Sequence, residues 1–179
     1  MVSPTPGLIV QMTGNLTTKR YKYATVFVDH FSRFSYAYLQ NTATVKETMV
    51  AKKAFESYAD SHNFRIFNYH ADNGIFRAND WIKDCQSDHN PQSMSFSGLD
   101  AHHKNWITER RIRDIQYSDR TMLIHTGHLW KTRITTNLWP YALRLGNQAY
   151  KNTPLLGNEQ VKTPTQLFTS TEVHNNPKY

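Results

Sequence analysis

The stretch "YKYATVFVDHFSRFSYAYLQ", residues 21–40, constrains the fold most because it is dense in Tyr, Phe and Val. These residue types favour β-strands. Two strand-like runs, residues 23–28 and 34–39, flank the segment from Asp29 to Arg33, which predicts an antiparallel hairpin. A sheet that contains this hairpin must bury an apolar face against other elements.

Helical and strand-like patterns alternate after the hairpin. Thr44 is a suitable N-cap for a helix that runs to about His62. The later patterns predict, in chain order, a strand at 64–71, a short helix capped by Asn79, an extended segment at 92–98, a long helix from about Lys104 to His125, a helix at 137–150 and a last turn at 163–168. This order predicts an α/β fold in which helices cover both faces of a sheet.

Size and composition narrow the class of protein. A chain of 179 residues suits one domain with a real core, and no apolar run approaches the roughly 20 residues of a membrane span. The single cysteine, Cys85, excludes a disulfide scaffold and a four-cysteine zinc site. The net charge of +7 fits a nucleic acid, an acidic protein or a membrane surface as partner, and charge alone does not choose among them.

A carboxylate follows the predicted strand in "NYHADNGIF". Asp72 stands where ligands bind in open α/β sheets, just beyond the carboxyl end of a strand, and it could hold a hard cation there. Asn73 and Gly74 suit an immediate turn of the backbone. Taken alone, the stretch fits an ordinary strand-ending turn better than a metal site.

A second carboxylate opens the long predicted helix. Glu109 is surrounded by basic residues in "AHHKNWITERRIRDIQ", and by itself this pattern fits a solvated helix face. Cations beside a metal-binding carboxylate are also what a phosphodiester substrate requires, because they neutralise its phosphates. Candidate DNA contacts are His103, Lys104, Asn105, Arg110, Arg111 and Arg113.

Four motifs together resemble one family. "VFVDHFSRF", "YHADNG", "AHHKNWITERRIRDIQ" and "NLWPYALR" are similar, in order, to the catalytic core of a copia-type LTR-retrotransposon integrase. That core belongs to the RNase H-like DDE polynucleotidyl transferases. The resemblance implies a mixed sheet flanked by helices, two Mg²⁺ or Mn²⁺ ions held by three carboxylates, and DNA as partner. It also implies hydrolysis at element DNA ends, strand transfer into target DNA, homo-oligomers, and location in the nucleus or in a cytoplasmic virus-like particle.

The resemblance gives roles to individual residues. Asp72 matches the second acid of the triad and Glu109 the third, both as catalytic metal ligands. The first acid belongs to a first strand ahead of the hairpin, and we expect this strand to be largely missing here. Residues 1–22 contain no Asp or Glu, and Asp29 matches the hairpin rather than the metal ligand. We therefore expect this chain to lack strand-transfer activity.

Two further expectations concern Trp106 and the domain limits. Trp106 stands where the family usually has Gly, and we expect it to stiffen the loop, with stacking on a base as the alternative. Residues 1–20 are predicted to be irregular, apart from one possible short strand, residues 21–170 to form the core, and residues 171–179 to be the tail of a cut polyprotein.

Two functions from different classes remain open. The first is a metal-dependent integrase core that is inactive in this chain. The second is a non-catalytic remnant of the same fold that binds nucleic acid or takes part in assembly. A zinc site built from His102, His103 and Cys85 is disfavoured, because the adjacent histidines point in different directions and no third ligand follows at regular spacing.

Overall fold

A computed structural model describes residues 7–13, 21–72, 74–87, 91–96, 106–131, 134–155 and 161–169, with the backbone alone described for 7–13. Its strands are β1 (Gly7–Thr13), β2 (Tyr23–Asp29), β3 (Ser35–Gln40), β4 (Asn68–Ala71) and β5 (Ser93–Phe96). Its α-helices are α1 (Val45–Ser61), α2 (Asn79–Cys85), α3 (Trp106–Leu129), α4 (Trp139–Lys151) and α5 (Pro164–Thr169), with short 3₁₀ turns η1 (Ile75–Arg77) and η3 (Thr136–Leu138).

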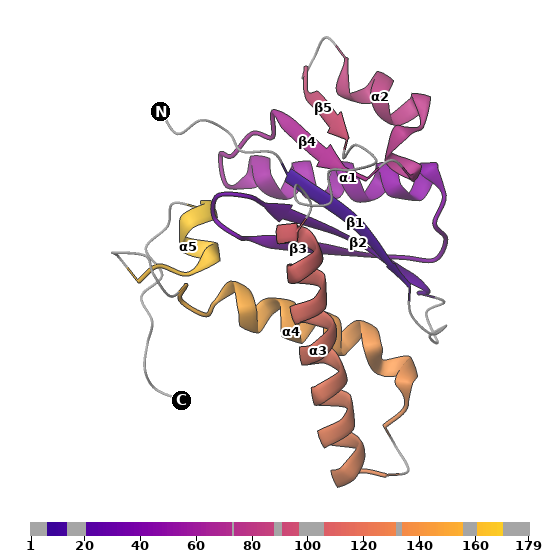
Figure 1. Cartoon of the computed structure of the whole chain (residues 1–179), viewed down its shortest axis with the longest axis vertical. Coiled ribbons are helices and arrows are strands. Elements are labelled where there is room, and N and C mark those ends of the chain that lie inside the picture. Colours follow the sequence, from indigo (N-terminus) through magenta and orange to yellow (C-terminus); the bar gives the residue numbers. More distant parts are fainter. Residues whose placement is uncertain are drawn as a thin grey trace.

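The strands form one mixed sheet in the order β3-β2-β1-β4-β5. Strands β1, β2 and β3 are antiparallel neighbours, as the hairpin pattern predicts. Strand β4 pairs in parallel with β1 and with β5, because α1 and α2 carry the chain back between successive strands. Figure 1 shows α1 on one side of this sheet and α3 and α4 on the other.

The first strand is present, which corrects the expectation that it is largely missing. Residues Gly7–Thr13, "GLIVQMT", form β1 at the centre of the sheet, paired with β2 along its whole length. The apolar insert is long enough to supply a full strand, although Pro and Gly around it favour an irregular segment. The predicted limit at residue 20 therefore cuts off an element of the sheet, and residues 171–179 lie outside the described residues.

Alternation along β2 divides the core into two layers. Phe27 faces α1, where it joins a cluster with Phe55, Tyr69 and Trp81. Ala24, Val26 and Val28 face the other way and pack against Ile107, Ile112 and Ile115 of α3 and Leu143 of α4. Each face of the sheet is thus covered by helices, as the α/β prediction requires (Figure 1).

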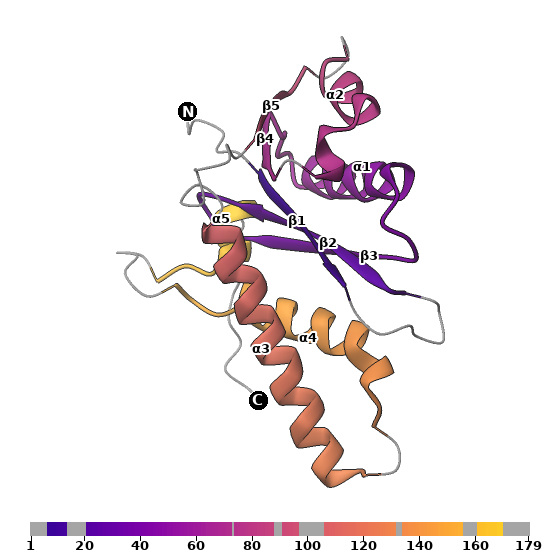
Figure 2. The same ribbon diagram turned by 45° about the vertical axis from the view of Figure 1, so that its right-hand side comes forward.

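Several predicted boundaries are close to the observed ones. Thr44 caps α1, and its side chain accepts a hydrogen bond from the Glu47 N–H. The strand predicted at 64–71 is shorter, because regular pairing begins at Asn68, and the cap of α2 is Ala78 rather than Asn79. Helix α3 continues to Leu129 and extends past the edge of the sheet (Figure 2). Within the described residues, no helix has the length and hydrophobicity to cross a membrane.

Candidate active-site edge and nucleic-acid interface

Asp72 is exposed and directly follows the last residue of β4. Tyr69 and Ala71 belong to the α1 side of the core, whereas His70 between them bonds through Nδ1 to Ser95 Oγ at 2.8 Å. Because side chains alternate along a strand, position 72 falls on the face opposite Ala71. That is the face on which α3 packs.

Glu109 lies in the first turn of α3 and is exposed. The same turn buries Ile107 and Thr108 against the sheet, so this end of α3 is anchored on β1 and β2. Strand alternation therefore predicts that Asp72 lies on the side of the sheet that α3 covers, where Glu109 begins the helix. The direct approach of the two carboxylates to one another stays a prediction.

The third carboxylate is not supplied by β1. Ile9 pairs with Ala71, so Val10 is the β1 position that comes next to the end of β4. The whole strand reads "GLIVQMT" and contains no acid. Within the described residues, no three His, Cys, Asp or Glu side chains are grouped as a metal site.

Asp29 has a structural role at the end of β2. Its Oδ2 accepts hydrogen bonds from the backbone N–H and the hydroxyl of Ser32, both at 2.7 Å. Strand spacing and rise place its Cα about 14 Å from that of Asp72, with β1 between them. Paired catalytic ions lie about 4 Å apart, so Asp29 does not replace the missing ligand.

The predicted DNA contacts have different surroundings. Arg110 and Arg113 are exposed on α3, as a phosphate contact requires. Arg111 is buried instead: its Nε donates to Ser35 Oγ at 3.2 Å and its Nη2 to Asn147 Oδ1 at 3.3 Å. Its place in the helix makes this unavoidable, because it lies one turn from buried Ile107 and Ile115. His103, Lys104 and Asn105 lie outside the described residues.

Burial changes the acid–base behaviour of Arg111. Desolvation lowers the pKa of its guanidinium to about 10, and the nearby Tyr150 and the carboxylates Asp114 and Asp119 oppose that shift. The group therefore stays cationic at neutral pH. Its guanidinium also lies over the Tyr150 ring, so α3 and α4 share one buried cation.

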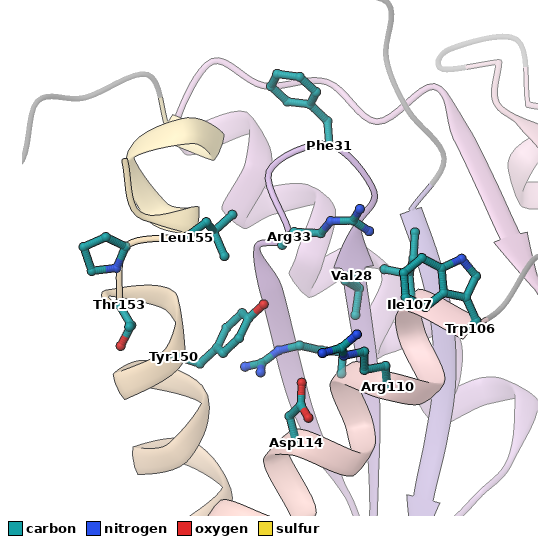
Figure 3. A pocket seen from close by; sticks show the side chains of 12 residues that line it. Val28, Phe31, Arg33, Trp106, Ile107, Arg110, Asp114, Tyr150, Thr153 and Leu155 are labelled. Atoms are coloured by element: carbon teal, nitrogen blue, oxygen red, sulfur yellow. The ribbon is translucent and has the colours of Figure 1, made fainter. Parts of the chain in front are cut away.

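A cavity of about 590 Å³ opens beside Arg111, at the junction of the hairpin turn, the start of α3 and the end of α4 (Figure 3). Its lining includes Arg33, Trp106, Arg110 and Tyr150. Sequence reasoning treated Arg33 as a turn residue and did not connect Tyr150 to this region. The Arg and aromatic residues that line the cavity come from segments that are far apart in the sequence, so no local pattern predicts the cavity.

Comparisons with known proteins agree with this architecture. Over 159 residues the chain is 29% identical to the retrovirus-related Pol polyprotein from transposon RE1 of Arabidopsis thaliana, and over 156 residues it is 29% identical to that from transposon RE2 of the same plant. These matches cover 87% and 84% of the chain. The chain spans only about a tenth of each polyprotein. No family model matches it.

Solved structures show the same fold. The chain of the simian T-cell lymphotropic virus intasome, in complex with PP2A regulatory subunit B56 gamma, aligns with a TM-score of 0.67 and 16% identity over 97% of this chain and 58% of that one. The catalytic core domain of BIV integrase aligns with a TM-score of 0.65 and 15% identity, over 94% and 95%. The chain is similar to retrotransposon Pol polyproteins and has the fold of integrase catalytic cores. The resemblance read from the four motifs and the RNase H-like fold class are confirmed.

A further structure bears on the metal and on assembly. The HTLV-2 integrase catalytic core in complex with magnesium, in a trimeric form, aligns with a TM-score of 0.62 and 19% identity over 94% of this integrase-like core and 98% of that chain. A dimeric form of the same core aligns similarly, with a TM-score of 0.63. One core with this fold, that of HTLV-2 integrase, was thus solved with magnesium and in both dimeric and trimeric forms.

Proposed function

We propose that this integrase-like core serves in DNA integration as a DNA-binding domain, and that alone it does not catalyse DNA-end processing or strand transfer. One observation carries the proposal: β1, the central strand, brings no carboxylate to the sheet edge that carries Asp72. The similarity to retrotransposon Pol polyproteins supports DNA as the substrate class.

The residues present do not fit a two-ion centre. Mg²⁺ and Mn²⁺ require octahedral oxygen coordination, and each ion of a pair needs carboxylate ligands of its own or shared with the other ion. Asp72 and Glu109 supply two of the three acids that the family resemblance implies. Asp29 does not supply the third, because it is hydrogen-bonded to Ser32 and lies two strands away from β4. One weakly held ion between Asp72 and Glu109 is the most that the arrangement supports.

Binding of DNA does not need the missing acid. The chain carries 21 Lys and Arg against 14 Asp and Glu. Arg110 and Arg113 stand exposed on the first turns of α3, beside the edge where Asp72 and Glu109 belong. Phosphate contacts of this kind give affinity that falls steeply with salt, because each one releases condensed counterions.

A direct assay tests the proposal. Purified chain, Mn²⁺ and a labelled duplex that mimics an element end should give a mobility shift but no cleaved or joined product. The shift should weaken between about 50 and 200 mM salt. A joined product that disappears in the Asp72→Asn variant would overturn the claim of inactivity. Failure to bind duplex or single-stranded DNA at about 50 mM salt would overturn the DNA-binding claim.

A role in assembly is the second candidate. The HTLV-2 core with the same fold occurs in dimeric and trimeric forms, which favours self-association of this chain as well. Sedimentation equilibrium of the isolated chain measures this directly. A monomer at all concentrations up to about 100 μM, well above the range of a stable oligomer, would exclude an assembly role for this domain by itself. If the domain acts on DNA in the cell, it works in the nucleus or in a cytoplasmic particle.

A further inference from the structure

The cavity at the hairpin turn combines positive charge with aromatic walls. Figure 3 shows Arg33 and Arg110 on opposite sides of it, with Trp106 at one end and Tyr150 at the other. Its volume of about 590 Å³ lies in the range that encloses one small organic ligand. A space of this size suits a single nucleotide rather than a double helix.

Arg33 is held in place by the turn that carries it. Its backbone has a φ of 62°, a left-handed conformation that is uncommon for residues other than Gly, Asn and Asp. The turn is fixed by the Arg33 N–H, which donates to Asp29 O at 3.0 Å, and by the Ser32 hydroxyl, which donates to the Asp29 carboxylate. A rigid turn therefore presents this guanidinium to the cavity.

The charges do not cancel inside the cavity. Among its described lining residues Asp114 is the one carboxylate, and its charge acts on Arg111, the buried guanidinium behind it. Arg33 and Arg110 remain to attract an anion. A guanidinium offers several N–H donors in a planar fork, which matches the oxygens of a phosphate.

The aromatic residues suit a nucleobase. Trp106 is 50% exposed at the first residue of α3 and lines the cavity, so its ring is accessible to a ligand there. Phe31 is 55% exposed on the hairpin turn at the same cavity. Stacking on such rings is worth about 1–3 kcal/mol per base and tolerates any base.

We propose that this cavity binds one unpaired nucleotide of a DNA strand, with its phosphate between Arg33 and Arg110 and its base on Trp106. The inference rests on the proposed DNA-binding function and narrows it to single-stranded or frayed DNA. It gives Trp106 a binding role in place of mere loop stiffening.

Fluorescence anisotropy with two labelled probes tests the inference: a single-stranded oligonucleotide of about 10 nucleotides and a blunt duplex hairpin. The variants are Arg110→Gln, Trp106→Leu and Arg33→Asn, the last chosen because Asn tolerates a positive φ. Arg120→Gln is the charge-matched control, since Arg120 is also exposed on α3 and lies about 15 Å further along the helix. Circular dichroism and thermal melts check that each variant folds.

Each cavity variant should weaken single-strand binding about tenfold, the loss expected when one phosphate or stacking contact is removed. Duplex binding should weaken less than threefold in Arg33→Asn and Trp106→Leu. Arg110→Gln should weaken duplex binding less than it weakens single-strand binding, because Arg110 is also a phosphate contact for a duplex, and Arg120→Gln should change either affinity less than threefold. Equal losses for both probes, or equal losses in Arg110→Gln and Arg120→Gln, would overturn the inference but leave DNA binding intact. Displacement of the oligonucleotide by poly-glutamate at equal charge would also overturn it, in favour of an acidic protein segment. If wild type binds neither probe, the proposed function fails as well.

Discussion

The carboxyl group of Asp119 on α3 lies directly against Gly146 on α4. A Cβ atom added at Gly146 would come 2.8 Å from Asp119 Oδ1, 3.1 Å from Ser118 Oγ and 3.2 Å from the Met122 methyl carbon. Asp119 is buried, and within the described residues its Oδ1 has no hydrogen-bond partner. The two helices are therefore in close contact at a glycine that faces a buried carboxyl group.

Replacement of Gly146 by Ala should destabilise the fold, even though Ala is the better helix former. The added methyl group forces the Asp119 side chain or α4 to move, and overpacking of this kind costs about 1–3 kcal/mol, which exceeds the helix-propensity gain of about 1 kcal/mol. Urea denaturation followed by circular dichroism measures the change. Gly127→Ala on α3 is the matched control, because a Cβ there meets nothing within 4 Å. Equal stability of the two variants would show that the helices are not in close contact at Gly146.

Asp119 should also make stability depend on pH. Burial raises the pKa of its carboxyl group from 3.8 to about 7, although Arg111 nearby lowers it. Because the folded pKa lies above the unfolded one, the folded state holds the proton more tightly. The contribution of Asp119 to the free energy of unfolding is greatest below about pH 4. It decreases as the pH rises to about 7, and above that pH it stays low. The total change is at most about 4 kcal/mol.

Comparison with Asp119→Asn isolates this effect. The neutral variant should lose the decline in the free energy of unfolding between pH 4 and 7, and near pH 8 it should be more stable than the wild type. Urea midpoints across that range measure both quantities. An identical pH profile in the two proteins would show that Asp119 is not desolvated in the folded state.

Local patterns predicted the hairpin and the helices well because their signals lie within short segments. The alternation of Tyr, Phe and Val gives β2 and β3, and Thr44 with Glu47 gives the start of α1. The first strand was underestimated because its place is decided by partners distant in the chain. Only the pairing with β2 and β4 shows that Gly7–Thr13 is central.

The site was predictable in part for the same reason. Asp72 and Glu109 stand at element ends that the sequence marks, Asp72 just after β4 and Glu109 in the first turn of α3. Arg111 resembles Arg110 and Arg113 in sequence, and only the packing of α3 on the sheet makes it a buried residue. The cavity beside it joins three segments, so no local pattern contains it.

Lys52 is a cation on the buried face of α1. Its ammonium group lies 2.5 Å from Asp84 Oδ2 and 3.0 Å from Glu56 Oε1, and the side chain is 2% exposed. Lys52→Ala should cost about 3–5 kcal/mol, because two partly buried carboxylates lose their partner. Lys53→Ala, at the exposed neighbouring position, should change stability by less than about 0.5 kcal/mol. Chemical denaturation of both variants measures these losses. Equal losses of stability in Lys52→Ala and Lys53→Ala would show that Lys52 forms only a surface ion pair.

Restoration of a carboxylate on β1 should create divalent-ion binding. Val10 follows the residue that pairs with Ala71 and itself pairs with Val26, whose side chain lies on the α3 face. Val10→Asp therefore adds an acid to the strand at the edge that carries Asp72, and the ion gains a third oxygen ligand. Isothermal titration with Mn²⁺ should show at least tenfold tighter binding than in the wild type. Val10→Asn is the control, because it adds polarity without charge, and Asp72→Asn in the Val10→Asp background should abolish the gain. A gain that survives that second change would show that the new carboxylate acts without Asp72, and that the two strands do not form a common metal site.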